Sequence, residues 1–364
     1  MTDPLRSPLD ALHRARGAHF TAFGGWELPQ YFVSDLAEHH AVRRAAGLFD
    51  LSHMAQLDLA GPGVGAGLDY ALLARHADMP LGRAAYSMLL TERGTVIDDL
   101  IVYRLAAEHW FIIANAANRA VVTSELAARL AGFDATLADV TPTRALIAVQ
   151  GPRSPGIVAA AGLPEAESLG YYRVATATLD DVPVILTRTG YTGETGFEVS
   201  CPREAAATLW QRFETAGETD GLTLCGLACR DTLRLEAGMP LHGHELDRDT
   251  TPVEGGQGWL LRRPKEADFV GKAALLGQPP RKHLIGLAGE GRRAARAGYA
   301  VLRDGQPVGR VTSGALSPTL GHPIALASVA GAAPAVGDTL QVDLRGQPTD
   351  FRVCAVPFLT KATA

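Results

Sequence analysis

The pattern of apolar and polar residues predicts that the chain begins with helices. Over the first 50 residues, the pattern indicates helices on either side of a loop rich in glycine and aromatic residues. Ser34 has the side chain of a helix N-cap, so we expect a helix from there through Ala46. Gly47 would then end this helix.

Strands dominate the next part of the chain. Leu57 and Leu59 alternate with polar neighbours, which is typical of a strand with one buried face. Residues 84–114 predict a β-meander, in which turns separate three apolar runs. The first turn lies at 92–94. Residues 116–132 have the periodicity of an amphipathic helix.

The same mixture of elements continues for another hundred residues. Apolar runs at 145–150 and 182–188 predict strands, and a loop punctuated by glycines leads to a further strand at 197–200. Helical patterns follow at 203–217 and 225–237. This part of the chain therefore predicts an α+β fold.

The C-terminal part has a different pattern. Segment 277–282, GQPPRK, combines Gly, Pro and charge, which favours a domain boundary. Beyond it lie six short apolar runs separated by turns: HLIGLA, YAVLRD, PVGRVTS, IALASVA, TLQVDL and FRVCAV. Because no helical pattern intervenes, we expect a small β-barrel or sandwich from residue 283 onward.

Composition narrows the class of protein. With 364 residues, 47% of them hydrophobic, the chain is long enough for two or three domains. The formal net charge of −5 arises from mixed signs and gives no broad footprint for nucleic acid or an anionic membrane. Four cysteines are too few for a disulfide framework, and no apolar run approaches the ~20 residues that cross a bilayer. The N-terminus does not have the pattern of a secretory signal, so we expect a cytoplasmic protein.

Two adjacent carboxylates, Asp98 and Asp99, lead into an almost wholly apolar strand. The strand period sends Asp99, Ile101 and Tyr103 to one face and Asp98 to the other. Since both faces are apolar, at least one carboxylate borders a buried environment, where an unpaired charge is costly. It is a candidate functional acid or base, although a cap at the strand end remains an alternative.

The loop RTGYTGETGFE, residues 188–198, is the second candidate site. Its three glycines allow tight turns and a close approach to a flat ligand. Tyr191 offers an aromatic face, and the carboxylate of Glu198 can accept two parallel N–H bonds of the kind that pterins and guanines present. A purely structural loop is the alternative.

Nucleotide and metal motifs are weak in this sequence. GPGVGAG at 61–67 departs from the dinucleotide-binding pattern, and a loop before a helix explains it better. Cys225 and Cys229 are more readily explained as small core residues than as metal ligands, and His242 with His244 has no complementary cluster. We therefore expect no bound metal. Arg230 and Arg234 share a helix face, where most charges form solvated surface pairs.

Taken together, these segments resemble the T protein of the glycine cleavage system. The resemblance covers nearly the whole chain in order, and its further segments are GLFDLSHM, IDDLIVY, NAANR, ALIAVQGP, CRDTLRLEAGMPLHGHEL and RVTSGALSPTLGHPIALA. It implies a three-domain cloverleaf around a central folate cavity, with a C-terminal β-barrel. The implied domains are 1–52 with 140–245, 53–139 with 246–278, and 283–364.

The resemblance also implies an activity. Members of this family act as aminomethyltransferases: they take an aminomethyl group from the lipoylated H protein and pass its carbon to tetrahydrofolate, with release of ammonia. By resemblance, Asp99 is the catalytic carboxylate and Glu198 binds the pterin. The other residues that match folate-cavity positions are Met54, Tyr86, Ile101, Tyr103, Asn115, Tyr191 and Arg230.

Three alternatives stay open at this point. The same scaffold could serve a non-catalytic folate-binding protein or a folate-dependent demethylase, because substrate choice lies in cavity-wall residues. A structural assembly subunit is the third, and the presence of Asp99, Glu198 and the tyrosines in one chain argues against it.

Overall fold

A computed structural model describes residues 3–262 and 265–359 of the chain. The chain divides into two compact units. Unit 1 runs from the first described residue to Leu89 and from Asp99 to Arg230, and unit 2 holds 90–98 and the described residues from Asp231 onward. Among the described residues, no helix is long and apolar enough to cross a membrane.

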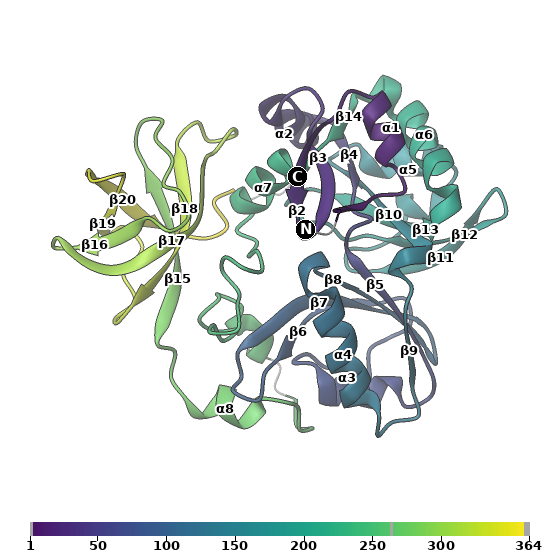
Figure 1. Cartoon of the computed structure of the whole chain (residues 1–364), viewed down its shortest axis with the longest axis horizontal. Coiled ribbons are helices and arrows are strands. Elements are labelled where there is room, and N and C mark those ends of the chain that lie inside the picture. Colours follow the sequence, from purple (N-terminus) through teal and green to yellow (C-terminus); the bar gives the residue numbers. More distant parts are fainter. Residues whose placement is uncertain (1–2, 263–264, 360–364) are drawn as a thin grey trace. The chain divides into compact units, whose positions relative to one another are not determined.

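A six-stranded sheet is the largest element of unit 1 (Figure 1). Its strands lie in the order β11 (Val174–Leu179), β12 (Val182–Thr187), β13 (Gly196–Pro202), β10 (Arg144–Gln150), β4 (Ala46–Asp50) and β14 (Leu222–Cys225). Helices α5 (Ser154–Ala160) and α6 (Ala206–Gly217) pack on the sheet. The core between them includes Ile147, Val199, Ile157 and Trp210, none of them exposed.

A second, five-stranded sheet carries the predicted β-meander. Its order is β6 (Ala84–Leu90), β7 (Val96–Ala106), β8 (His109–Ala114), β5 (Ala55–Ala60) and β9 (Thr136–Asp139). Helices α3 (Val64–Ala71) and α4 (Arg119–Leu130) lie beside each other along this sheet (Figure 1). The predicted strands and the helix after the meander are therefore confirmed.

The N-terminal segment contains strands where the prediction had only a loop. Helices α1 (Asp10–Ala15) and α2 (Asp35–Arg44) exist, but β2 (His19–Phe23) and β3 (Trp26–Tyr31) form a hairpin where a loop was expected. Gly24 and Gly25, with φ of 56° and 84°, make its two-residue turn possible. Strand β1 (Leu5–Arg6) completes a small sheet with β3.

The N-cap of α2 is confirmed, but its stop is not. The Ser34 side chain accepts a hydrogen bond from the Ala37 N–H. Gly47 does not end the helix, because α2 finishes at Arg44 and Gly47 lies in β4. A Cβ at Gly47 would lie 2.5 Å from Val42 Cγ2 and 2.7 Å from Cys225 Sγ, so close packing rather than helix termination requires this glycine.

Unit 2 is built around a closed barrel of six strands. They are β15 (Lys282–Gly289), β18 (Pro323–Ala330), β17 (Gln306–Leu316), β16 (Ala300–Arg303), β19 (Thr339–Asp343) and β20 (Pro348–Cys354). Leu287, Val301 and Val342 are completely buried in its core. The barrel predicted from residue 283 onward is confirmed, as is the mixed α+β fold that precedes it.

Helix α7 (Leu227–Glu236) enters unit 2 with its last turns. The side chain of Arg234 is 1% exposed and donates to Glu245 at 3.1 Å and to Ser313, on β17, at 2.8 Å. The expectation of a solvated surface pair is therefore wrong for Arg234, although the exposed carboxylate of Asp231 does lie 2.7 Å from its guanidinium.

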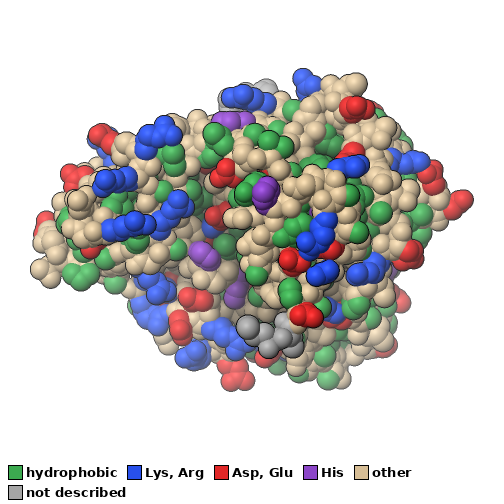
Figure 2. All heavy atoms as spheres, turned by 45° about the horizontal axis from the view of Figure 1, so that its top comes forward, with side chains coloured by type: hydrophobic (Ala, Val, Ile, Leu, Met, Phe, Trp, Pro, Cys, Tyr) green, Lys and Arg blue, Asp and Glu red, His purple; other side chains and the backbone are tan. Residues whose placement is uncertain are grey.

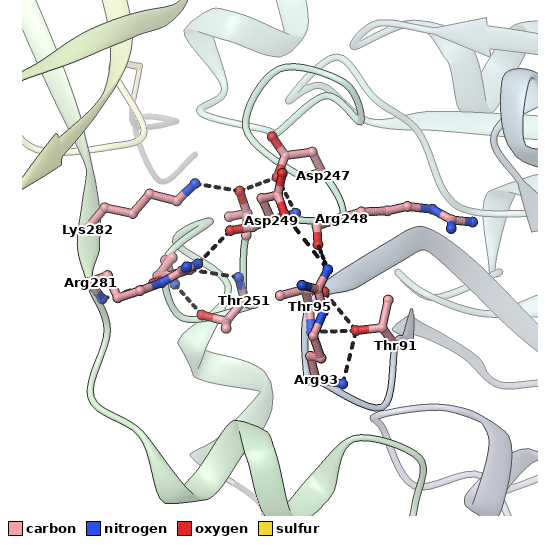
Figure 3. Close-up of polar contacts among 11 residues, drawn as sticks. Thr91, Arg93, Thr95, Asp247, Arg248, Asp249, Thr251, Arg281 and Lys282 are labelled. Carbon is pink, nitrogen blue, oxygen red and sulfur yellow. Dashed lines mark hydrogen bonds and ion pairs between the residues drawn. The ribbon is translucent and has the colours of Figure 1, made fainter.

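A polar network joins distant segments of unit 2 (Figure 3). The Thr91 hydroxyl accepts from the N–H of Arg93 at 3.2 Å and so shapes the β6–β7 turn, and Arg281 holds the buried carboxylate of Glu254 at 3.0 Å. Helix α8 (Lys272–Gly277) and the short turn Gly258–Arg262 lie in the segment before Arg281. This network fixes the chain that leads into the barrel.

Surface charges have mixed signs. On the face drawn in Figure 2, Lys and Arg side chains are interspersed with Asp and Glu. Such a mixture creates no strong field of one sign on that face.

Candidate active site

Asp99 lies at the start of the apolar strand β7, and neutral donors hold its carboxylate. The Tyr86 hydroxyl, from β6, donates to Asp99 Oδ2 at 2.9 Å. The Asn115 amide, at the end of β8, donates to Asp99 Oδ1 at 2.8 Å and to the Asp99 carbonyl oxygen at 3.1 Å. Tyr86, Asp99 and Asn115 were all predicted as site residues. They lie together because β6, β7 and β8 are neighbours in one sheet.

Strand alternation separates the two aspartates as predicted. Asp98 is completely buried, whereas Asp99 is only partly buried. On the Asp99 face lie Ile101, which is partly buried and pairs with Ile113, and Tyr103, which is completely buried. Asp99 is thus the more exposed carboxylate of the pair.

Glu198 lies on β13 and is 7% exposed. Its Oε2 accepts from the Thr189 hydroxyl at 2.5 Å, and that hydroxyl lies 3.3 Å from the Tyr103 hydroxyl. Burial raises the pKa of Glu198, while the Thr189 hydrogen bond and the positive charge of Arg230 act in the opposite direction. A buried carboxylate with so few partners is a candidate ligand-binding group.

Arg230 supplies the positive charge near Glu198. Its guanidinium carbon lies 4.8 Å from the centre of the Tyr191 ring, the geometry of a cation–π contact. Burial lowers the pKa of Arg230, which Glu198 and Tyr191 partly offset. The Tyr86 pKa is raised by burial, by Asp99 and also by Tyr191, so Tyr191 acts on the Asp99 group as well as on Arg230.

Two glycines of segment 188–198, Gly190 and Gly196, lie close to the side chain of Gln150. Gln150, which is completely buried, donates from Nε2 to the Thr189 carbonyl oxygen at 3.2 Å and accepts from Thr192 at 3.0 Å. A Cβ at Gly190 or Gly196 would lie 2.0 or 2.3 Å from the Gln150 amide. The loop is therefore wrapped around Gln150, which accounts for two of its three glycines.

Met54 is the predicted residue that the structure ties least to the others. It is partly buried, follows β4 and donates its N–H to the Leu51 carbonyl oxygen at 2.9 Å. Its place in the ligand site stays a prediction.

Tyr172 is a further residue of this region that no sequence pattern indicated. This residue has a φ of 55°, which is rare for an aromatic residue. Its N–H donates to the Arg188 carbonyl at 3.0 Å, and its own carbonyl accepts from Ala84 at 2.9 Å. Burial raises its pKa, and both Glu198 and Asp99 contribute to the shift, so the phenol is near both carboxylates. Nothing in the spacing of the sequence marks it.

A buried cluster of Glu38, Cys225 and Cys229 has its potential ligand atoms within 4.8 Å of one another. The Glu38 carboxylate already accepts from the N–H groups of Phe32 at 2.6 Å and Gly226 at 2.9 Å. Burial raises the Cys225 pKa well above its ordinary value, which keeps its thiol protonated. These contacts favour the core role predicted for the two cysteines.

His244, which was considered above as a possible metal ligand with His242, has a structural contact. His244 Nδ1 lies 2.8 Å from the Thr312 carbonyl oxygen in unit 2. That contact ties the segment after α7 to the barrel strand β17.

The geometry defines a class of protein first: a mixed α+β protein with a C-terminal barrel and a carboxylate, Asp99, that neighbouring side chains hold in place on the five-stranded sheet. Family models agree with this architecture. Residues 9–265 match the GCVT N-terminal domain, and residues 282–359 match the glycine cleavage T-protein C-terminal barrel domain.

Relatives extend along the whole chain. An aminomethyltransferase from Cutibacterium acnes is 50% identical, with 100% of both chains covered. One from Streptomyces avermitilis is 48% identical over 98% of this chain and 97% of the relative. The crystal structure of glycine cleavage system aminomethyltransferase T from Bartonella henselae has a TM-score of 0.92 and 36% identity, with 98% of both chains covered. The chain belongs to the glycine cleavage T-protein family, the aminomethyltransferases.

Proposed function

We propose that this protein is the aminomethyltransferase of the glycine cleavage system and that its co-substrate is tetrahydrofolate. The observation that carries the proposal is the Asp99 carboxylate, which is held by Tyr86 and Asn115 and acts on the same Tyr172 phenol as Glu198 does. The full-length similarity to aminomethyltransferases supports the same activity.

Glu198 and Tyr191 suit the recognition of a pterin ring. The Glu198 carboxylate accepts from Thr189 at Oε2, and a carboxylate has further acceptor positions for a ligand that presents a ring N–H beside an exocyclic amine. The Tyr191 ring is backed by Arg230 and offers a flat surface for stacking. Met54, Ile101 and Tyr103 complete the folate contacts that we propose.

Asp99 suits the transfer step. The carbon to be moved lies between the sulfur of the dihydrolipoyl arm and an amino nitrogen. It gains cationic, iminium-like character as the sulfur leaves, and again as ammonia leaves once one folate nitrogen is bonded to it. Both folate nitrogens end bonded to this carbon, so their two protons leave, one with the sulfur and one with ammonia. A carboxylate fixed by Tyr86 and Asn115 can stabilise the positive charge and receive a folate N–H proton without reorganising.

The donor of the one-carbon unit in this proposal is the lipoylated H protein, and the setting is the cytoplasm. No metal takes part in the proposed step. The test is ammonia release from aminomethylated H protein, measured with and without tetrahydrofolate. Folate-dependent release supports the proposal. Folate binding without release would instead indicate a non-catalytic folate protein.

A further inference from the structure

Thr189 occupies a buried position between β12 and the glycine-rich loop, with 2% of its surface exposed. Its hydroxyl oxygen lies within hydrogen-bonding distance of three other oxygens. They are Glu198 Oε2 at 2.5 Å, Thr187 Oγ1 at 2.7 Å and the Tyr103 hydroxyl at 3.3 Å. Since a hydroxyl has one proton and two lone pairs, these three contacts use its full capacity.

The direction of the protons in this cluster follows from chemistry. An ionised carboxylate only accepts, so the Thr189 proton points to Glu198. Thr189 must then accept from the other two hydroxyls. Tyr103 is suited to donate because burial and the nearby Glu198 raise the pKa of its phenol well above the ordinary value. Thr187 also lies 3.3 Å from the Glu198 carbonyl oxygen, a longer contact than the one to Thr189.

The backbone of Thr189 is fixed independently of any ligand. Gln150 donates to its carbonyl oxygen, and the next residue, Gly190, has no room for a Cβ against the same amide. Thr187, two residues earlier, pairs with Glu198 across the β12–β13 ladder. The hydroxyl and the carboxylate are therefore held in register by the protein itself.

We propose that Thr189 is a positioning residue, which fixes the Glu198 carboxylate as an ionised acceptor and is itself oriented by Thr187 and Tyr103. The proposal rests on the pterin-binding role proposed above for Glu198 and deepens it. Thr189 contacts the carboxylate rather than the ligand, so it acts through Glu198.

Several charged and titratable groups influence Glu198 besides Thr189. Arg230 from α7 favours the ionised form, and burial opposes it. The phenols of Tyr103, from β7, and Tyr172, from the segment before β11, also interact with this carboxylate. Burial raises the pKa of Glu198, and the Thr189 hydroxyl and Arg230 lower it. If the hydroxyl is removed, only Arg230 opposes the effect of burial, so the pKa of Glu198 should rise.

Thr189→Val tests the proposal, because valine keeps the shape and removes the hydroxyl. The full-length protein, labelled with ¹³C at its glutamate carboxyl carbons, is titrated by NMR, and Glu198→Gln assigns the signal. We expect the Glu198 midpoint to rise by roughly one pH unit in Thr189→Val and to return toward the wild-type value in Thr189→Ser. An unchanged midpoint in Thr189→Val would overturn the proposal.

Ligand binding gives a second measurement. Tetrahydrofolate, titrated anaerobically at pH 7, should bind about tenfold more weakly to Thr189→Val, with a loss that increases as the pH falls. Thr178→Val is the matched control, because Thr178 is an exposed threonine on β11, and it should leave affinity and midpoint unchanged. Equal weakening in both valine variants would contradict the proposal.

Two further results keep the test decisive. If Thr189→Val does not fold, Thr187→Val takes its place, since it removes only the hydroxyl that orients Thr189; a midpoint shift supports the proposal and an unchanged midpoint contradicts it. If the midpoint shifts in Thr189→Val but Glu198→Gln still binds tetrahydrofolate normally, the positioning role stands and the pterin-binding role of Glu198 is wrong.

Discussion

Asp99→Asn is the substitution that separates catalysis from binding most clearly. The change keeps the size of the side chain and removes its charge. In the structure, both Asp99 oxygens accept hydrogen bonds, one from Asn115 and one from Tyr86. An amide oxygen can still accept from Asn115, and the amide N–H₂ can donate to the Tyr86 hydroxyl oxygen, because a phenol both donates and accepts. We therefore expect the variant to fold with its local geometry preserved.

The size of the effect follows from the role proposed for the charge. A positioned acid or base contributes about 10²–10⁴ in rate, which corresponds to roughly 3–5 kcal/mol of transition-state stabilisation. Folate binding should survive within several-fold, because Glu198 and Tyr191 supply the recognition. The fall should therefore occur in turnover at saturating tetrahydrofolate.

The assay is ammonia release at saturating tetrahydrofolate, with melting temperature measured on the same samples. Asp98→Asn is the matched control: Asp98 is the preceding residue on the same strand, completely buried, on the opposite face. Its substitution should lower the melting temperature and reduce turnover much less. Equal turnover of Asp99→Asn and wild type, at matched folding and folate saturation, would refute the mechanism.

Other predictions address the ligand, the loop, pH and metals. Glu198→Gln should weaken folate binding by roughly 1.5–3 kcal/mol in calorimetry, because an amide cannot accept both pterin N–H bonds. Gly196→Ala should lower melting temperature and folate affinity, because its Cβ would meet Gln150 at 2.3 Å, whereas Gly156→Ala, with open space around its Cβ, should not. Hydrogen bonds from Arg281 lower the pKa of Glu254 from 4.5 to about 2, although burial of this carboxyl group acts to raise it. Its stabilisation is therefore complete above pH 4.5 and is lost as pH falls toward 2, so Glu254→Gln should flatten that part of a plot of unfolding free energy against pH. Elemental analysis should find no stoichiometric metal.

Much of the fold could be predicted because local patterns and burial agree. Residues 84–114 alternate as strands do, and the structure buries both faces of β7 as the apolar pattern implied. The hairpin at 19–31 was missed because its aromatic residues and paired glycines are equally typical of a loop. Gly47 was misassigned because a glycine that permits close packing is indistinguishable in sequence from one that ends a helix.

Only part of the geometry around the candidate site could be predicted from the sequence. Strand alternation predicts that Asp99 and Asp98 lie on opposite faces of the strand. The meander explains why Tyr86 and Asn115 can donate hydrogen bonds to Asp99. The roles of Gln150 and Tyr172 depend on contacts between segments distant in the sequence, which no local pattern contains. The same limit applies to Arg234, whose burial is set by Glu245 and by Ser313, far along the chain.

The transfer reaction proposed for this protein is best tested by following the transferred carbon itself. H protein carrying a ¹³C-labelled aminomethyl group on its lipoyl arm is mixed with this protein and tetrahydrofolate, and the label is followed by NMR. We expect the ¹³C to appear in methylenetetrahydrofolate, with one ammonia released for each carbon transferred, and we expect Asp99→Asn to slow both together. Label that stays on the H protein, or that appears as free formaldehyde at the same rate with and without tetrahydrofolate, would contradict the proposed reaction.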